Sequence, residues 1–188
     1  MKKLLLIAFA GSIVAASSLM AGDWYIGASV ASSSTKIDTV GADAIVNSSK
    51  LKNGYGIKGG YSFNESNSLE LEYVRITKNI DGSRVNYVYK YPMGDIKPFI
   101  GGGVGFIKYG EDFNVDGSVY TFDKRATSWN VKAGLVYEVA KHHEVELGYD
   151  YMSINNTAQH YVTPSQLVGI DLKNVRIGRL YAEYNYHF

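Results

Sequence analysis

The chain has 188 residues, with 19 Lys and Arg against 18 Asp and Glu, and it contains no cysteine. This length predicts one domain or two small ones, and the mixed charge with ordinary apolar content argues against a disordered chain. The near-neutral charge leaves no basic excess to attract nucleic acid. The counts of 16 Tyr, 20 Gly and 3 Pro indicate a β-rich chain with many turns.

Residues 1–21 differ in composition from the rest of the chain. Lys2 and Lys3 precede the apolar run 4–10, and Ala21 offers a small residue at a cleavage point. A basic start, a short apolar core and a small-residue end predict a secretory signal peptide that is cleaved near Ala21. The alternative is an N-terminal membrane anchor, but three serines dilute a stretch that is already short for spanning.

We expect residues 22–188 to form the mature domain. Without Lys2 and Lys3, 17 basic residues face 18 acidic ones, so the formal net charge becomes −1. An exported chain without cysteine has no disulfides. Its stability must therefore come from closed secondary structure or from a good core.

The mature domain shows β-strand periodicity rather than a transmembrane helix, for which about 18 consecutive apolar residues would be needed. Apolar residues recur at every second position, as in a strand with one apolar face. Eight segments show this alternation in chain order: 24–30, 55–63, 69–73, 85–91, 98–109, 129–138, 145–151 and 180–188.

The connections between these segments alternate in length. Long polar connections at 32–50, 110–126 and 155–173 are expected to be loops at one end, where a compact turn at 79–83 contains Asp81-Gly82, a favoured hairpin dipeptide. The other connections are short. An even number of strands with long loops on one side and tight turns on the other predicts an all-β fold, an eight-stranded antiparallel up-and-down β-barrel.

The two strand faces predict which side of the barrel is apolar. A soluble carrier barrel would bury the apolar face, but that face carries more Tyr and Trp than the interior of eight strands can hold. We therefore expect a transmembrane barrel with its polar face inward. The predicted lumen charge network comprises Lys58, Glu70, Glu72, Lys132, Glu144, Glu146, Arg179 and Glu183, and Arg84, Lys90 and Asp150 share this face. Its near-balanced signs favour ion pairs that fill the lumen over a proton or ion path.

Aromatic residues on the apolar face are expected to form two girdles at the membrane interfaces. The predicted girdle residues are Trp24, Phe63, Tyr91, Tyr186 and Phe188 near the periplasmic ends of the strands, and Trp129 and Tyr151 near the outer ends. Arg75 and Lys108 lie on the same parity near outer ends, where their charged groups can reach lipid phosphates.

The signal peptide, the eight alternating segments, the ending Tyr184-x-Tyr186-x-Phe188 and the stretch KPFIGGGVGF at 97–106 resemble the small outer-membrane β-barrel family of the OmpX and OmpA barrel-domain type. The resemblance implies an envelope protein of the outer membrane of a Gram-negative bacterium, a member of the porin-type families that include surface antigens and adhesins. It also implies that Tyr184, Tyr186 and Phe188 form a signal for the outer-membrane assembly machinery. Its implied partners are outer-membrane lipid and lipopolysaccharide.

No motif predicts catalysis, a metal site or a cofactor. Gly54-Tyr55-Gly56-Ile57-Lys58-Gly59 matches G-x-G-x-x-G, but no helix follows, so we interpret the three glycines as inward positions that make space in a narrow barrel. Ser153, His160 and Ser165 are the nearest candidates for a lipid-modifying enzyme, and they match no catalytic motif. We expect a non-catalytic envelope protein with a structural role, whose long loops either contact a host or surface ligand or are solvated surface without a ligand. The alternatives are a narrow channel and, less favoured, an outer-membrane lipid-modifying enzyme.

Overall fold

The computed structural model describes residues 22–40, 51–78, 80–115, 118–154, 159–162 and 167–188, with side chains except at 36–40, 109–115, 118–124, 159–162 and 167–174. Most of these residues lie in strands: β1 (Asp23–Val40), β2 (Lys52–Ser62), β3 (Asn67–Thr77), β4 (Ile80–Lys90), β5 (Ile96–Val115), β6 (Ser118–Ala140), β7 (His143–Ile154), β8 (Gln159–Val162) and β9 (Leu167–His187). Within this part of the chain, no helix is long and apolar enough to cross a membrane.

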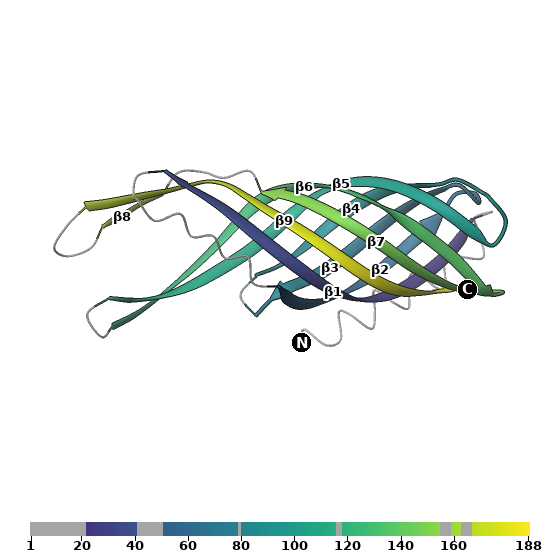
Figure 1. The fold of residues 1–188 in the computed structure, drawn as a ribbon, viewed down its shortest axis with the longest axis horizontal. Coiled ribbons are helices and arrows are strands. Elements are labelled where there is room, and N and C mark those ends of the chain that lie inside the picture. Colours follow the sequence, from purple (N-terminus) through teal and green to yellow (C-terminus); the bar gives the residue numbers. More distant parts are fainter. Residues whose placement is uncertain (1–21, 41–50, 79, 116–117, 155–158, 163–166) are drawn as a thin grey trace.

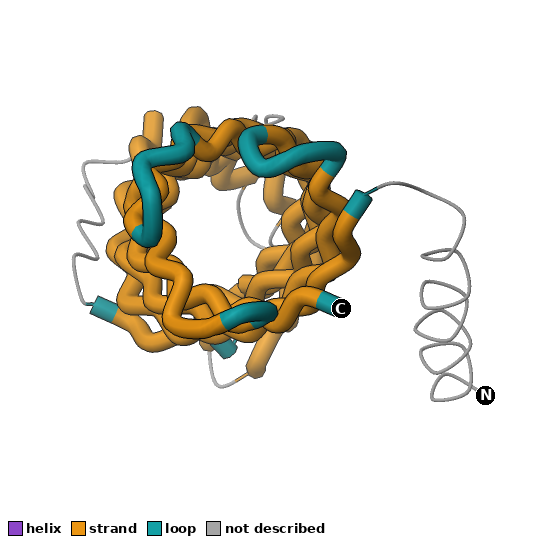
Figure 2. Tube along the Cα trace, turned by 90° about the vertical axis from the view of Figure 1, so that its right-hand side faces the viewer, coloured by secondary structure: helices purple, strands orange, loops and turns teal. Residues whose placement is uncertain are grey.

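Eight of the strands form a closed ring (Figure 2). Each strand from β1 to β6 pairs antiparallel with the next, β7 pairs with β9, and β9 pairs with β1. The first and last strands join over a long register that begins at Tyr25 opposite His187. This closure removes both sheet edges and confirms the predicted eight-stranded antiparallel barrel. The short strand β8 lies outside the ring and pairs with residues 167–170 of β9.

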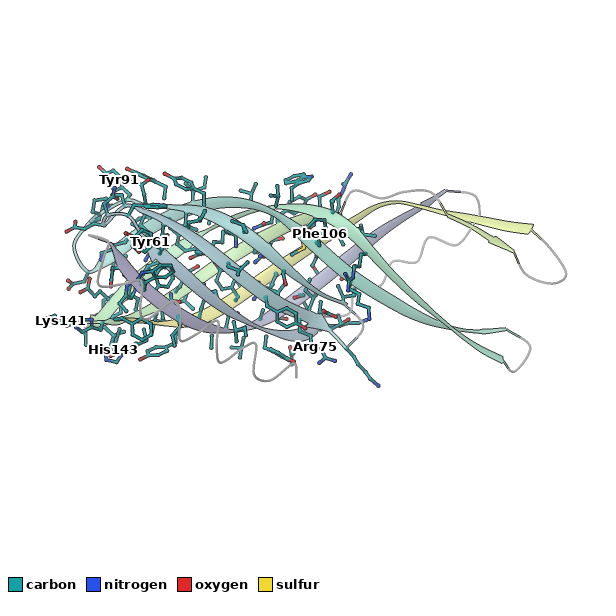
Figure 3. The ribbon with its side chains drawn as sticks, turned by 180° about the vertical axis from the view of Figure 1, so that it is seen from behind. Tyr61, Arg75, Tyr91, Phe106, Lys141 and His143 are labelled. Carbon is teal, nitrogen blue, oxygen red and sulfur yellow. The ribbon has the colours of Figure 1, made fainter. Side chains whose placement is uncertain are left out.

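Three short turns and the C-terminus share one end of the barrel (Figures 1 and 3). Asn64 stabilises the β2–β3 turn by accepting hydrogen bonds from the amides of Ser66 and Asn67, both at 2.9 Å. The two-residue β6–β7 turn places His142 at a positive φ of 71°. Because short turns of outer-membrane barrels face the periplasm, we call this end the inner rim and the opposite end the outer rim.

The strands differ strongly in length. β2, β3 and β4 have 11 residues each and β7 has 12, which matches the roughly 9–11 residues that a tilted strand needs to cross a bilayer. In contrast, β1, β5, β6 and β9 have 18, 20, 23 and 21 residues. Figure 1 shows these four strands continuing well beyond their neighbours at the outer rim. We call residues 34–40, 110–115, 118–127, 159–162 and 167–174 the outer extension.

The outer extension corrects the expectation of three long outer loops. Much of 32–50, 110–126 and 155–173 is paired β-strand, and residues 41–50, 116–117, 155–158 and 163–166 lie outside the described part. The physical reason is that apolar alternation requires one apolar environment, lipid or core, on one face of the strand. Beyond the bilayer, pairing can continue without that pattern.

Side-chain exposure alternates along the barrel strands. In β4, for example, Arg84, Asn86, Val88 and Lys90 are buried inside, whereas Val85, Tyr87 and Tyr89 are exposed outside. The outer wall bears large exposed apolar residues such as Val30, Val104 and Leu180, each 64–67% exposed. A soluble barrel would bury such residues, so this surface is one that requires lipid.

Candidate functional site

The centre of the lumen holds a compact group of charged side chains. Lys58 Nζ lies 2.8 Å from Glu70 and 3.0 Å from Glu146, and it also contacts Glu183. Lys132 Nζ lies 2.5 Å from the other Glu70 oxygen and 3.7 Å from Glu146. These five residues, the central cluster, come from β2, β3, β6, β7 and β9. They are all buried, so their mutual pairing must offset the loss of hydration.

A second group of ion pairs, the arginine cluster, lies on the outer side of the central cluster. Glu72 lies 2.8 Å from Arg84 and 3.0 Å from Arg179. Asp150 lies 2.6 Å from Arg84 and 3.6 Å from Arg179. Two guanidinium groups therefore alternate with two carboxylates across the lumen. Arg84 and Asp150 complete this arrangement, and their inward parity in β4 and β7 is the sequence signal that identifies them.

Two tyrosines extend the central cluster through hydrogen bonds. Tyr25 donates to Glu70 at 2.8 Å, and Tyr181 donates to Glu146 at 2.5 Å. Both rings are buried on the inward face of their strands. Glycines make room for them, because a Cβ at Gly60 would lie 2.2 Å from Cζ of Tyr25, and one at Gly148 would lie 2.7 Å from Cζ of Tyr181.

Glu144 belongs to a separate group at the inner rim. Its carboxylate lies 2.7 Å from Lys90 Nζ and 3.1 Å from His187 Nε2, and His187 Nδ1 lies 2.7 Å from Asp23. These residues line a pocket of about 460 Å³ that opens at this rim. Lys97 also borders it and pairs with Glu138 at 2.9 Å. Of the eight predicted network residues, seven lie in the central and arginine clusters, and only Glu144 lies apart.

The outer third of the lumen is apolar, which the sequence analysis did not anticipate. A buried apolar cluster there consists of Val74, Ile76, Ile107, Ala126, Met152, Ile154, Val175 and Ile177. The signal in the sequence is an inversion of polarity. In the segment 73–77, the inward residues Val74 and Ile76 are apolar and the outward residue Arg75 is charged. Nearer the middle of the same strand, the inward residues are charged and the outward residues are apolar. This cluster lies between the ion pairs and the outer rim.

The predicted girdle residues lie on the outer wall toward its two ends. At the inner rim, ring centroids are 4.9 Å apart for Trp24 and Tyr61, and 5.4 Å apart for Tyr186 and Phe188. Phe63 and Tyr91 are exposed at the same rim, where Figure 3 shows Tyr61 and Tyr91. Trp129 and Tyr151 form a contact with centroids 6.0 Å apart on β6 and β7.

The last strand is tied to its neighbours at the inner rim. The amide of Phe188 donates to the carbonyl of Trp24 at 2.9 Å, and the amide of His187 donates to the carbonyl of His142 at 2.9 Å. The Tyr184 hydroxyl lies 2.5 Å from Nδ1 of His143. Tyr184, Tyr186 and Phe188 thus lie on one outward face of the strand that closes the barrel.

The glycine motifs occupy strand positions. β2 is strand throughout 52–62, with Gly54 and Gly56 facing inward and Gly59 facing outward with open space beside it. The inward placement expected for all three glycines is therefore wrong for Gly59. In β5, a Cβ at Gly103 would lie 2.2 Å from Oδ1 of Asn86, so this glycine leaves room for a lumen side chain.

The structure does not assemble the three enzyme candidates into a described site. Ser153 lies on β7 opposite Arg176 of β9, the side chain of His160 is outside the described part, and so is residue 165. Among the described residues, no group of three or more His, Asp or Glu side chains is arranged to hold a metal ion.

A closed barrel with an ion-paired lumen and a lipid-type outer wall defines a transmembrane β-barrel of the bacterial outer-membrane class. Residues 4–188 match the family model described as outer membrane protein beta-barrel domain, and the chain belongs to this family. This places it among outer-membrane proteins and confirms the family resemblance. The comparison with curated protein sequences finds no match.

Solved structures show the same fold. Neisserial surface protein A is 16% identical with a TM-score of 0.59, over 88% of this chain and 97% of that chain. Outer membrane protein H from P. aeruginosa is 20% identical with a TM-score of 0.56, over 88% of this chain and 99% of that chain. The outer membrane protein AlkL is 14% identical with a TM-score of 0.55, over 90% and 91%. At these identities the similarity shows the fold alone.

Proposed function

We propose that this protein is a non-catalytic, non-conducting outer-membrane barrel that stabilises the envelope and contacts an external ligand through its outer extension. The observation that carries this proposal is the contrast between its two halves. The lumen is filled with paired side chains, whereas paired strands extend from the outer rim into the space beyond the bilayer. The role in export of residues 1–21 belongs to the same proposal, since an outer-membrane protein must be secreted.

Two successive barriers support the absence of conduction. The central and arginine clusters span the lumen with side chains that are at most 5% exposed. Beyond them, the buried apolar cluster would have to admit ions without hydration, which is costly. An eight-stranded barrel is just wide enough for its side chains to fill.

The outer extension supports the contact role. A hairpin of β5 and β6 is held by a regular register from Gly110 opposite Asp123 to Val115 opposite Ser118. Paired strands present a surface at lower entropic cost than a flexible loop, because less backbone freedom is lost when a ligand binds. The ligand is expected to be a host or surface molecule.

A deletion tests the contact role. Removing residues 111–122 and joining Gly110 to Asp123 through Asn-Gly keeps the register of the hairpin below the cut. A second variant replaces residues 159–170 in the same way and removes β8. Bacteria expressing each variant are compared for adhesion to cultured epithelial cells. At least one deletion should reduce adhesion while the protein still changes gel mobility on heating as a folded barrel does. Unchanged adhesion in both variants would contradict the contact role.

Conductance and lipid measurements test the two alternatives. Purified protein in planar bilayers should show no discrete openings, and regular openings would favour a narrow channel. Lipid A mass spectra from cells with and without the protein should be the same, and a changed profile would favour a lipid-modifying enzyme.

A further inference from the structure

The pocket of about 460 Å³ at the inner rim, which we call the inner-rim pocket, separates its charges by depth. The side chains of Lys90 and Lys97 are only 7% and 17% exposed. The side chains of Glu138 and Asp23 are 43% and 46% exposed. Among the described lining residues, Glu144 is the one carboxylate that lies as deep as the two lysines. The floor of the pocket therefore has a surplus of positive charge.

The mouth of the inner-rim pocket has a surplus of negative charge. Glu65 and Lys141 are both exposed in its lining, and their opposite charges cancel. The carboxylates of Asp23 and Glu138 remain. Figure 3 shows Lys141 and His143 at this end of the barrel. A positive floor below a negative mouth suits a ligand that carries a carboxylate at one end and an ammonium group at the other.

The floor is closed toward the centre of the lumen by Tyr25. Its ring stacks on the ring of His187, with centroids 4.9 Å apart, and Nζ of Lys90 lies 5.6 Å from its centroid. On the side of the central cluster, its hydroxyl donates to Glu70 at 2.8 Å. The inner-rim pocket is therefore a cup that can hold a ligand, and its volume lies within the range of about 300–1,000 Å³ that is typical of ligand pockets.

The deep lysines and the most exposed carboxylate lie on opposite walls of this cup. Lys97 is on β5 and Asp23 is on β1, which are four strands apart in either direction around the ring. An α-amino acid carries both of its charged groups on one carbon, so it can reach only one wall. A short peptide carries them at its two ends, and each extended residue adds about 3.3–3.6 Å between them.

We propose that the inner-rim pocket binds short peptides with free ends, with the terminal carboxylate against Lys90 and Lys97 and the terminal ammonium group against Asp23. A lysine ammonium group has three donors, and these two lysines each donate to one carboxylate, Glu144 at 2.7 Å and Glu138 at 2.9 Å. Their other donors can form charge-assisted hydrogen bonds with a peptide carboxylate. This inference goes beyond the proposed function, because the pocket lies at the opposite end from the outer extension and opens toward the periplasm.

The test measures binding of trialanine to the folded protein in non-ionic detergent micelles by isothermal titration calorimetry. Low ionic strength and about pH 7 keep both ends of the peptide charged and weakly screened. N-acetyl-trialanine lacks the ammonium group, trialanine amide lacks the carboxylate, and alanine carries both groups on one carbon. Each of the three should bind the wild type about tenfold more weakly than trialanine, the loss expected for one hydrogen bond to a charged group.

Two variants assign the ends of the peptide. In D23N, acetylation should weaken binding by no more than about threefold, whereas amidation should still weaken it about tenfold. In K97M, the effect of amidation should fall to about threefold and that of acetylation should remain about tenfold. K52Q at the outer rim and D95N in the turn between β4 and β5 remove one charge each outside the pocket lining. These two controls should bind all four ligands as the wild type does.

Three results would overturn the proposal. Absence of trialanine binding to the wild type, or equal binding of its acetylated and amidated forms, would exclude the site. Alanine that binds as tightly as trialanine would exclude peptides as the ligand class. Acetylation and amidation effects that are unchanged in D23N and K97M would exclude the assigned contacts. The comparison of ligands on the wild type requires no substitution, so it decides the question even where a variant fails to fold.

Discussion

Replacing Lys58 with methionine should strongly destabilise the barrel. Lys58 Nζ contacts the carboxylates of Glu70, Glu146 and Glu183 in the lumen, and the residue is 5% exposed. Methionine keeps much of the side-chain volume, so the main effect is electrostatic. In K58M the three carboxylates keep only Lys132 as a cation of the central cluster. Removing one partner of a buried ion pair costs about 3–5 kcal/mol, and we expect K58M to fall in this range.

The assay is urea unfolding of the refolded protein in lipid vesicles, monitored by the fluorescence of Trp24 and Trp129, the only two tryptophans of the chain. K97M is the control because Lys97 pairs with the partly exposed Glu138, and an exposed pair contributes about 0–1 kcal/mol. Adding E183Q to K58M removes one of the unpaired carboxylates and should recover about 1–2 kcal/mol. If the free energy of unfolding of K58M lies within about 1 kcal/mol of that of the wild type, the central cluster does not stabilise the barrel through its ion pairs.

Three further predictions concern lumen space, assembly and export. G60A should lose about 1–3 kcal/mol of stability, because its Cβ would lie 2.2 Å from the hydrogen-bonded Tyr25 ring. G59A is the control, since open space surrounds that position and the variant should be neutral or slightly stabilising. Equal urea midpoints of the two variants would contradict this prediction. Deleting Phe188 removes the hydrogen bond from its amide to the Trp24 carbonyl and its ring contact with Tyr186. Less heat-modifiable protein should therefore reach the outer membrane than with F63A, which removes an aromatic ring of similar exposure at the same rim. Equal yields of the two variants would mean that Phe188 is an ordinary girdle residue. N-terminal sequencing of protein purified from outer membranes should begin at Gly22, and a retained Lys2-Lys3 segment would exclude cleavage near Ala21.

The barrel could be predicted from the sequence because lipid and lumen impose opposite demands on alternate residues. Segments such as 55–62 and 182–187 show this contrast, and both lie in strands of the ring. The lengths of β5 and β6 could not be predicted in the same way. Where both faces of a strand meet water, polar residues suit either face, so a paired strand and a loop have similar sequences.

The sequence predicts which residues face the lumen, but not which of them contact one another. Parity alone identifies Lys58 and Glu70 as inward residues. It does not show that Lys58 also contacts Glu146, which is distant in sequence and lies across the lumen. That contact depends on strand stagger, which sets the heights at which strands meet across a barrel. Tyr25 and Tyr181 also have inward parity, but their hydrogen bonds to Glu70 and Glu146 depend on the same stagger, and Gly60 and Gly148 supply the space that their rings need.

At the outer rim, the polarity of the residues changes at the same level on the inner and on the outer face of the barrel. Below it, charged residues must point inward because lipid covers the outer wall, and they can be buried only as ion pairs. Above it, the outer wall meets headgroups, so Arg75 can point outward, and the inward positions are occupied by the apolar Val74 and Ile76 on the outer side of the arginine cluster. Bilayer thickness thus determines both where the lumen becomes apolar and where cations become available for anionic lipid. The closure of the lumen and the cations on the outer wall are therefore two consequences of the same change in strand polarity.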